Sequence, residues 1–314
     1  MAKEKIVVSL TGGLGNQLFQ LSVGMSLTQE SHEDIVLETG IGKPRLNKFG
    51  DPELSSFQLP KGVKFDNNRT GSWLVRKSLG YVLRMGVTPR YYEKSKLVAS
   101  LISALSGCVG AIYFRGYRTL VYGEGVGFFE MKKTESRQVL IGYFQSEYWP
   151  NQVYETLMEI KPNNGSKKFQ DLKRKFENED ILAVHIRRGD YEAEDSFGLL
   201  TRDYYVEAIN ELLSKKSFSS IWVFTDSPNE IPQYFPPHLS TKIFIAPEEL
   251  DTAETFELMR YAKAYIIANS TFSWWAAYLS YAKNAIIYAP DPWFKNIQDP
   301  ARLIPASWEK RPGH

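Results

Sequence analysis

The chain has 314 residues, of which 43% are hydrophobic, 14% aromatic and 24% charged, with a formal net charge of +2. This composition excludes a disordered chain, and the near-neutral charge argues against a nucleic-acid-binding protein. The length favours two domains. A single cysteine, Cys108, excludes an internal disulfide and fits a reducing compartment, and four histidines without a Cys/His cluster provide no structural zinc site.

The chain opens with a strand, a glycine-rich turn and a helix. The runs KIVVSL (5–10) and DIVLE (34–38) predict parallel strands on either side of a helix at 16–30. The turn between them, TGGLGNQLFQ (11–20), is typical either of a dinucleotide site or of a loop whose backbone approaches a sugar nucleotide. The apolar core of the first ten residues is too short for a signal peptide.

Residues 97–114 carry no charge and approach the length of a membrane span. Serines and glycines dilute this segment, so we predict a buried helix that ends near Gly107 and then a strand, rather than a transmembrane helix. The preceding residues 76–96 are basic, which favours a solvated face, with contact to an anionic membrane as the alternative. Residues 139–149 (VLIGYFQSEYW) predict a further strand that ends in an aromatic and acidic cluster.

The second half is more regular. A polar stretch at 161–168 (KPNNGSKK) is the predicted linker. Beyond it, strands alternate with helices of about 12 residues, which predicts right-handed βαβ units and a parallel sheet. The predicted strands are 181–188, 220–227, 242–246, 265–269 and 284–289, and the predicted helices are 201–216, 251–264 and 270–283.

Polar side chains follow three of these strands, and ligands of open α/β sheets bind beyond the carboxyl ends of the strands. The first strand end, AVHIRRGDY, carries His185, Arg187, Arg188 and Asp190. Because side chains alternate along a strand, Arg187 is the better placed of the two arginines to reach into a crevice. The alternative is an Arg–Asp pair that only ties down the loop.

The other two strand ends extend this site. After VFTDS, Asp226 can accept hydrogen bonds from a ribose or a base, or can cap the next helix. The third end leads into a helix N-terminus, which is a typical anion site, through Asn269, Ser270, Thr271 and Ser273. No Asp-x-Asp occurs in the chain. We therefore expect a leaving diphosphate to be stabilised by Arg187 and helix N–H groups, without a metal ion.

Four motifs, in the order GGLGNQLFQ, GYFQSEYW, VHIRRGDY and ELMRYAKAYIIANSTFSWWAAYL, resemble the α-1,2-fucosyltransferases. The resemblance implies an α/β, GT-B-type fold in which two Rossmann-like domains face across a cleft. Residues 1–160 would then bind the acceptor and residues 161–314 GDP-fucose, and the extreme C-terminus could pack back on the first domain. The implied reaction moves L-fucose from GDP-β-L-fucose to the 2-hydroxyl of a terminal β-galactoside, with inversion and with no metal or other cofactor.

The resemblance also implies roles for single residues. Arg187 would contact the β-phosphate with Arg188 nearby, Glu257 would accept hydrogen bonds from guanine, and Ser270, Thr271 and Ser273 would meet the diphosphate. The expected donor contacts of the glycine-rich turn are Gly13, Gly15, Asn16 and Gln17, and the expected acceptor contacts are Gln145 and Glu147. Asp190 is the expected base, with Glu192, Glu194 and Asp195 as alternatives, and His185 would support the donor or the acceptor.

Other interpretations stay open at this point. The histidine-arginine-arginine motif is shared with α-1,6- and protein O-fucosyltransferases. Gly13 and Gly15 with Glu38 partly match the NAD(P) fingerprint of an oxidoreductase, but Leu18 stands where the third glycine belongs. The aromatic content also suits a lectin-like protein. The likeness to bacterial members implies a cytoplasmic enzyme acting on a galactose-terminated oligosaccharide, with residues 76–96 as the candidate contact to the inner membrane face.

Overall fold

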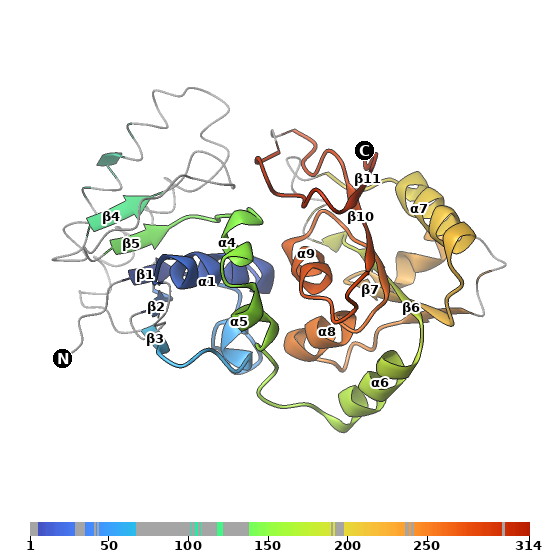
Figure 1. Cartoon of the computed structure of the whole chain (residues 1–314), viewed down its shortest axis with the longest axis horizontal. Helices are drawn as coiled ribbons and strands as arrows, with labels where there is room; N and C mark the ends of the chain where they lie inside the picture. Colours follow the sequence, from blue (N-terminus) through green and yellow to red (C-terminus); the bar gives the residue numbers. More distant parts are fainter. Residues whose placement is uncertain are drawn as a thin grey trace. The chain divides into compact units, whose positions relative to one another are not determined.

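Two parallel β-sheets organise the chain, one in each of two structural units of the computed structural model (Figure 1). Unit 1 comprises Met1–Ile160 and Pro300–Leu303, and unit 2 comprises Lys161–Asp299 and Ile304–His314. The structure describes residues 6–28, 35–40, 42, 44–66, 101, 104–105, 108, 118–121, 138–189, 191, 198–235, 239, 242–296 and 299–314.

The sheet of unit 1 has the strand order β3-β2-β1-β5-β4, and all its pairings are parallel. The strands are β1 (Ile6–Ser9), β2 (Ile35–Glu38), β3 (Val63–Asp66), β4 (Arg118–Val121) and β5 (Gln138–Ile141). Every residue of β1, β2 and β5 is buried, as expected for strands that are covered on both faces. The helix α1 (Leu14–Thr28) follows β1 at once and packs against it.

The predicted strands at 5–10 and 34–38 and the helix between them are therefore confirmed. The predicted strand at 139–149 is correct only in its first residues. After β5 the chain turns at Phe144, and its aromatic end forms the short helix α4 (Tyr148–Asn151), followed by α5 (Tyr154–Met158).

Most of the apolar segment 97–114 lies outside the described residues, as does the basic stretch 76–96. Residues 101, 104, 105 and 108 are helical, but Leu101 and Leu105 are 56% and 59% exposed. The prediction of a buried helix is thus wrong for these residues. In the part of the chain that the structure describes, no helix is both long enough and apolar enough to cross a membrane.

The sheet of unit 2 is also parallel, with the strand order β11-β10-β9-β6-β7-β8. Its strands are β6 (Ile181–Ile186), β7 (Ser220–Thr225), β8 (Ile243–Ile245), β9 (Ala264–Ile266), β10 (Ile286–Pro290) and β11 (Glu309–Arg311). Its helices are α6 (Lys167–Asn178), α7 (Arg202–Lys215), α8 (Thr252–Met259) and α9 (Thr271–Tyr278), with the 3-10 helix η5 (Pro228–Tyr234) after β7.

The predicted alternation of strands and helices after residue 180 is confirmed, and with it the α/β class, with a parallel sheet in each of two units. Helix α6 was not predicted, because the polar stretch that indicated a linker runs into its first two residues. Ser166 begins this helix by accepting the N–H of Phe169. The edge strand β11 was missed because its three residues are all charged.

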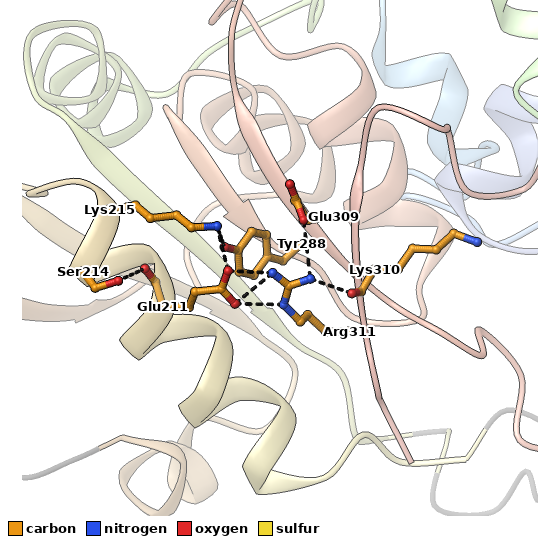
Figure 2. A network of polar contacts seen from close by, with 7 residues as sticks. All are labelled: Glu211, Ser214, Lys215, Tyr288, Glu309, Lys310 and Arg311. Atoms are coloured by element: carbon orange, nitrogen blue, oxygen red, sulfur yellow. Dashed lines mark hydrogen bonds and ion pairs between the residues drawn. The ribbon is translucent and has the colours of Figure 1, made fainter.

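A network of charged side chains ties β11 to α7 (Figure 2). The guanidinium of Arg311 binds both carboxylate oxygens of Glu211, with Nη2 2.7 Å from Oε1 and Nε 3.0 Å from Oε2. Lys215 Nζ lies 2.7 Å from Glu211 Oε1 and 2.9 Å from the hydroxyl of Tyr288. Because Arg311 and Lys215 both donate to it, the pKa of Glu211 is lowered to about 2. The carboxylate therefore stays charged and holds the edge of the sheet.

Replacing Glu211 by glutamine should weaken this edge, because the two cations lose the charge they share. We expect the free energy of unfolding, measured by urea denaturation, to fall by about 1 kcal/mol in dilute buffer. The loss should shrink at about 1 M salt, where partly exposed charges are screened. Asp180→Asn, which removes a single exposed contact to Lys216 at 3.4 Å, is the matched control. Equal losses in the two variants would contradict a special role for the network.

Candidate functional site

The second sheet reverses its direction of growth between β6 and β9. From β6 the chain adds β7 and β8 on one side and then crosses back through α8 to add β9 and β10 on the other. Ligands of open α/β sheets bind at the carboxyl ends of the strands beside such a reversal. The segments that follow β6 and β9 therefore form the candidate site, and they carry the arginine motif and the start of α9.

His185 joins these two segments. It lies one residue before the end of β6, and its Nδ1 is 2.8 Å from Oγ of Ser273 in the first turn of α9. The imidazole is only 5% exposed. Burial, together with the nearby positive charge of Arg187, lowers the pKa of His185 to about 3. The ring is therefore neutral at neutral pH, and it fixes the distance between the strand end and the helix start without adding a charge.

Asp226, directly after β7, holds the turn that follows β6. Its Oδ2 is 3.0 Å from Nη1 of Arg187, and its Oδ1 accepts the backbone N–H of Arg188 at 3.0 Å. A Cβ atom at Gly189 would come within 2.5 Å of Oδ2, so the turn closes on this carboxylate only with glycine there. The sequence offered a ligand contact or a helix cap for Asp226. The structure shows it orienting Arg187, and the 3-10 helix that follows β7 has no side-chain cap among the described residues.

The two adjacent arginines differ in their surroundings. Arg188 is drawn toward η5, where its Nε lies 2.7 Å from Glu230 Oε2. The guanidinium of Arg187 lies over the ring of Tyr191, 5.7 Å from its centroid, and the Tyr191 hydroxyl donates to the carbonyl of Asn269 at 3.2 Å. Of the two, Arg187 is thus the one connected to the segment that precedes α9.

The start of α9 supplies the second part of the site. Ser270 is the N-cap residue, and its side chain makes no capping hydrogen bond in the described structure. The first-turn N–H groups of a helix have no partner within the helix and attract anions. The predicted contacts Thr271 and Ser273 both lie in this turn, and the Ser273 hydroxyl is hydrogen-bonded to His185. Trp274 and Trp275, which follow, are fully buried in the core.

Asn269 supports this segment from behind. Its side chain is buried, and its Nδ2 donates to the carbonyl of Gly198 at 3.1 Å. Gly198 has a φ of 70° and leads into α7 through Thr201, whose N–H donates to the carbonyl of Gly313. The amide of Asn269 therefore braces the chain that enters α7, a role that the sequence did not indicate.

Glu257 lies in α8, and its contacts reach the C-terminal end of α9. Its carboxylate accepts hydrogen bonds from Arg260 Nη1 and from the Tyr281 hydroxyl, both at 2.8 Å. Arg260 Nε in turn donates to the carbonyl of Leu279, just after the end of α9. Eight helical residues span about 12 Å, so this buried network is one helix length away from His185. These contacts give Glu257 a structural role and lend no support to the expected guanine contact.

In unit 1, the protein's own groups close the glycine-rich turn. Glu53 accepts the N–H of Leu14 at 2.6 Å and so occupies the N-terminus of α1, where a dinucleotide-binding turn would hold the pyrophosphate. Glu38, the acid of the NAD(P) fingerprint, is 1% exposed and accepts hydrogen bonds from Ser9 and from the Gly40 N–H. Neither feature suits a dinucleotide cofactor.

The predicted residues of the turn have different roles: the glycines shape the backbone, Gln17 braces the loop and Asn16 contacts Gln145. Gly12 has a φ of 71°, which glycine adopts easily, while Gly13 precedes α1 and Gly15 lies inside it. Gln17 is fully buried: its Nε2 donates to two backbone carbonyls and its Oε1 accepts the N–H of Leu54, so it braces the loop. Asn16 instead points across the turn, and its Oδ1 accepts from Gln145 Nε2 at 2.9 Å.

The remaining predicted residues have few described contacts. The backbone N–H of Glu147 donates to the carbonyl of Arg302 at 2.8 Å. Asp190, Glu192, Glu194 and Asp195 lie outside the described residues, so the expected base has no structural account. In the parts of the chain that the structure describes, no group of three His, Cys, Asp or Glu side chains is placed to hold a metal ion.

Comparison with known proteins gives a consistent picture. Residues 114–299 match the model of glycosyl transferase family 11. The chain is 29% identical over 314 residues to an alpha-1,2-colitosyltransferase of Escherichia coli, covering 96% of this chain and 97% of that one. It is 33% identical over 136 residues to the E. coli O-antigen biosynthesis glycosyltransferase WbnK, covering 42% and 45%.

Among solved structures, the fucosyltransferase NodZ from Bradyrhizobium is similar, with 14% identity and a TM-score of 0.48 over 89% of this chain and 94% of that one. The E. coli ADP-heptose lps heptosyltransferase II is similar with 13% identity and a TM-score of 0.49, over 98% and 90%.

The buried, neutral His185 predicts a pH-dependent stability. The unfolded imidazole has a pKa of about 6.5, so it binds a proton that the folded form excludes. The stabilisation is complete above that pKa and is lost as the pH falls toward the folded value of about 3. At about pH 5 the loss should be about 2 kcal/mol in unfolding free energy. Urea denaturation of the wild type and of His185→Gln near pH 7.5 and pH 5 tests this. The same pH dependence in both proteins would contradict it.

Proposed function

The chain belongs to glycosyl transferase family 11, and from this we propose that it transfers L-fucose from GDP-β-L-fucose to the 2-hydroxyl of a terminal β-galactoside. The observation that carries the proposal is that Arg187 and the start of α9 follow β6 and β9, the two neighbouring strands at the reversal of the second sheet. A permanent cation and a helix N-terminus, held together by a neutral histidine, suit the diphosphate of a sugar nucleotide.

The sugar of the donor has a second candidate. The relative whose alignment with this chain covers 97% of its length is named an alpha-1,2-colitosyltransferase. Colitose is L-fucose without its 3-hydroxyl, so the same diphosphate site can serve either donor. The choice between them then depends on whether the protein bonds that one hydroxyl. The oxidoreductase alternative has no support, because the family consists of glycosyltransferases and Glu53 occupies the turn where NAD(P) would bind.

The proposed reaction is one inverting displacement. The acceptor O2 attacks C1 of the sugar, the bond from C1 to the β-phosphate oxygen breaks, and its electron pair leaves with GDP. Asp190 is the proposed base that takes the O2 proton. Charge grows on the leaving oxygen, so donors that point at this oxygen stabilise the transition state more than the ground state. Asp226 keeps Arg187 in place for this purpose before the donor arrives.

The protein's own charges can stabilise a diphosphate by a free energy large enough to do without a metal ion. A unit charge pair at 4 Å contributes about 4 kcal/mol at an effective dielectric constant of 20. Asp226 already neutralises part of the Arg187 charge, so the net contribution to a bound diphosphate is smaller than this. The first-turn N–H groups of α9 add to it. We therefore propose a metal-independent transfer.

The acceptor and the location are proposed on separate grounds. We propose a galactose-terminated oligosaccharide as the acceptor, because the relative WbnK is named for O-antigen biosynthesis. From the resemblance of the sequence to bacterial fucosyltransferases, we also propose a cytoplasmic enzyme, with residues 76–96 as the contact to the inner membrane face.

A direct assay tests the proposed function. GDP-fucose and GDP-colitose are each incubated with methyl β-galactoside, lactose or buffer, with EDTA in every reaction, and both GDP release and product linkage are measured. We expect acceptor-dependent GDP release that EDTA does not reduce, with a new α-1,2 linkage by NMR. Absence of transfer from both donors, or a different linkage, would contradict the proposal.

Arg187 should contribute to the chemical step itself. In Arg187→Ala, kcat should fall by at least about 10²-fold, as expected for the loss of one transition-state donor. The matched control is Arg202→Ala, because Arg202 is an exposed arginine at the start of α7 in the same unit. It should keep nearly full turnover. A fall of less than about threefold in Arg187→Ala would remove this residue from the proposed role.

A further inference from the structure

The first sheet reverses its direction of growth as the second does. Strands β2 and β3 extend it on one side of β1, while β5 and β4 extend it on the other, so the reversal lies between β1 and β5. The rule that places ligands beside a reversal applies here too. The residues that follow these two strands are the glycine-rich turn and the segment 142–147.

One pair of side chains connects the two segments across this reversal. Nε2 of Gln145, which follows β5, donates to Oδ1 of Asn16, which follows β1, at 2.9 Å. The side chain of Gln145 is 5% exposed. Its other polar atom, Oε1, is closed off from solvent and has no hydrogen-bond partner among the residues that the structure describes. A buried amide oxygen without a partner carries the full cost of its desolvation.

Two neighbouring glutamines show that this arrangement is unusual within the unit. Gln20 accepts the N–H of Thr11 at 3.0 Å and donates to the carbonyl of Gly142 at 2.9 Å. Gln17 likewise has both ends of its amide bonded to backbone groups. Both are buried braces whose hydrogen bonds are complete. Gln145 differs from them because it donates to a side chain and because its acceptor oxygen is left over.

The backbone before Gln145 carries a second unfavourable feature. Phe144 is fully buried and has a φ of 56°, in the left-handed region that bulky residues rarely adopt. Such strain persists only where the surrounding structure imposes it, and it concentrates at binding sites. A strained turn and an unpaired acceptor therefore stand next to each other, at the edge of the sheet where a ligand is expected.

The charges around the pair indicate a neutral ligand. The N-terminus of α1, which would otherwise attract a phosphate, is occupied by Glu53. A Cβ atom built on Gly13 would lie 3.6 Å from Glu53 Oε2 and 3.9 Å from Arg45 Nη1, so an anion and a cation both stand at this turn and offset each other. A neutral amide pair at such a turn suits uncharged groups that donate hydrogen bonds, and sugar hydroxyls are such groups. This differs from the second sheet, where the reversal carries Arg187.

We propose that Asn16 and Gln145 form a hydroxyl-binding subsite, in which Gln145 Oε1 accepts a hydrogen bond from a hydroxyl of a bound sugar ring. The inference rests on the proposed function, since both the donor and the acceptor of that reaction carry such hydroxyls. Because Oε1 is closed off in the free protein, the side chains around it shift when the sugar enters. The bound hydroxyl then satisfies the oxygen that the free protein leaves unpaired.

The test pairs Gln145→Leu with substrates that lack one hydroxyl. The donor arm compares GDP-fucose with GDP-colitose, and the acceptor arm compares methyl β-galactoside with its 3-, 4- and 6-deoxy forms. We expect kcat/KM of the wild type to fall about 10-fold when one particular hydroxyl is absent. Gln145→Leu should lose a similar factor with the intact substrate but nothing further with that deoxy substrate. Whether the hydroxyl belongs to donor or acceptor then follows from the arm in which this occurs.

Stability gives an independent readout. Leucine removes a buried oxygen that has no partner among the described residues, and the half-buried Asn16 that loses its hydrogen bond to Gln145 can turn toward solvent. Gln145→Leu should therefore unfold at an equal or higher temperature than the wild type, while its activity falls. The matched control is Gln20→Leu, which breaks two complete hydrogen bonds and should lower the melting temperature without any selective response to a deoxy substrate. Unchanged kcat/KM in Gln145→Leu, or losses that multiply for every deoxy substrate, would overturn the subsite.

The subsite can also be tested if no donor supports transfer. Methyl β-galactoside and free L-fucose are titrated into the protein while the side-chain amide resonances of Gln145 are followed by NMR, assigned with Gln145→Leu. A saturable shift with either sugar supports the subsite even though the proposed reaction has failed. No shift with both sugars at about 10 mM, a concentration that would detect millimolar binding, overturns the subsite.

Discussion

The ion pair between Arg187 and Asp226 is the interaction on which the site in unit 2 depends. An arginine on a turn after a strand has many rotamers, and a ligand that binds it must restrict them. Here the carboxylate at the end of the neighbouring strand holds the guanidinium 3.0 Å away and also binds the next backbone N–H. Gly189 permits this close approach. The cation is thus already positioned in the free protein, so the diphosphate that we propose as its ligand would have little side-chain freedom to restrict on binding.

The two sheets carry different chemistry at corresponding points of their topology. Each reverses its direction of growth, and in each the strand ends beside the reversal hold side chains that contact one another. In unit 2 these are a guanidinium, a neutral imidazole and a helix N-terminus. In unit 1 the helix N-terminus is occupied by Glu53, and the facing groups are uncharged amides. This difference is the basis of our proposal that unit 2 binds the anionic part of a substrate and unit 1 a hydroxyl-bearing part.

Much of the fold of unit 2 and part of its site could be predicted from local sequence. Alternating apolar runs and helical periodicity indicated the strands and helices after residue 180, and polar residues at strand ends indicated His185 and Arg187. That Glu257 lies far from the strand ends that carry Arg187 could also have been predicted. The predicted helix at 251–264 runs toward the start of the next strand. A residue near its end therefore lies away from the carboxyl edge of the sheet.

Other features depend on contacts that one sequence does not encode locally. The strand order, and with it the two reversals, arises from packing between distant segments. The roles of Gln17 and Asp226 likewise depend on backbone groups 28 to 38 residues away in the sequence. Helix α6 begins inside a stretch whose polar composition is typical of a linker, and only Phe169 and Phe176 of that helix are buried.

A crystal structure of the complex with GDP tests the central claim most directly. The account predicts that the two phosphates lie within hydrogen-bond distance of the Arg187 guanidinium and of the backbone N–H groups at residues 271–273. It would be contradicted by phosphates bound at the glycine-rich turn of unit 1, with Glu53 displaced from the N-terminus of α1.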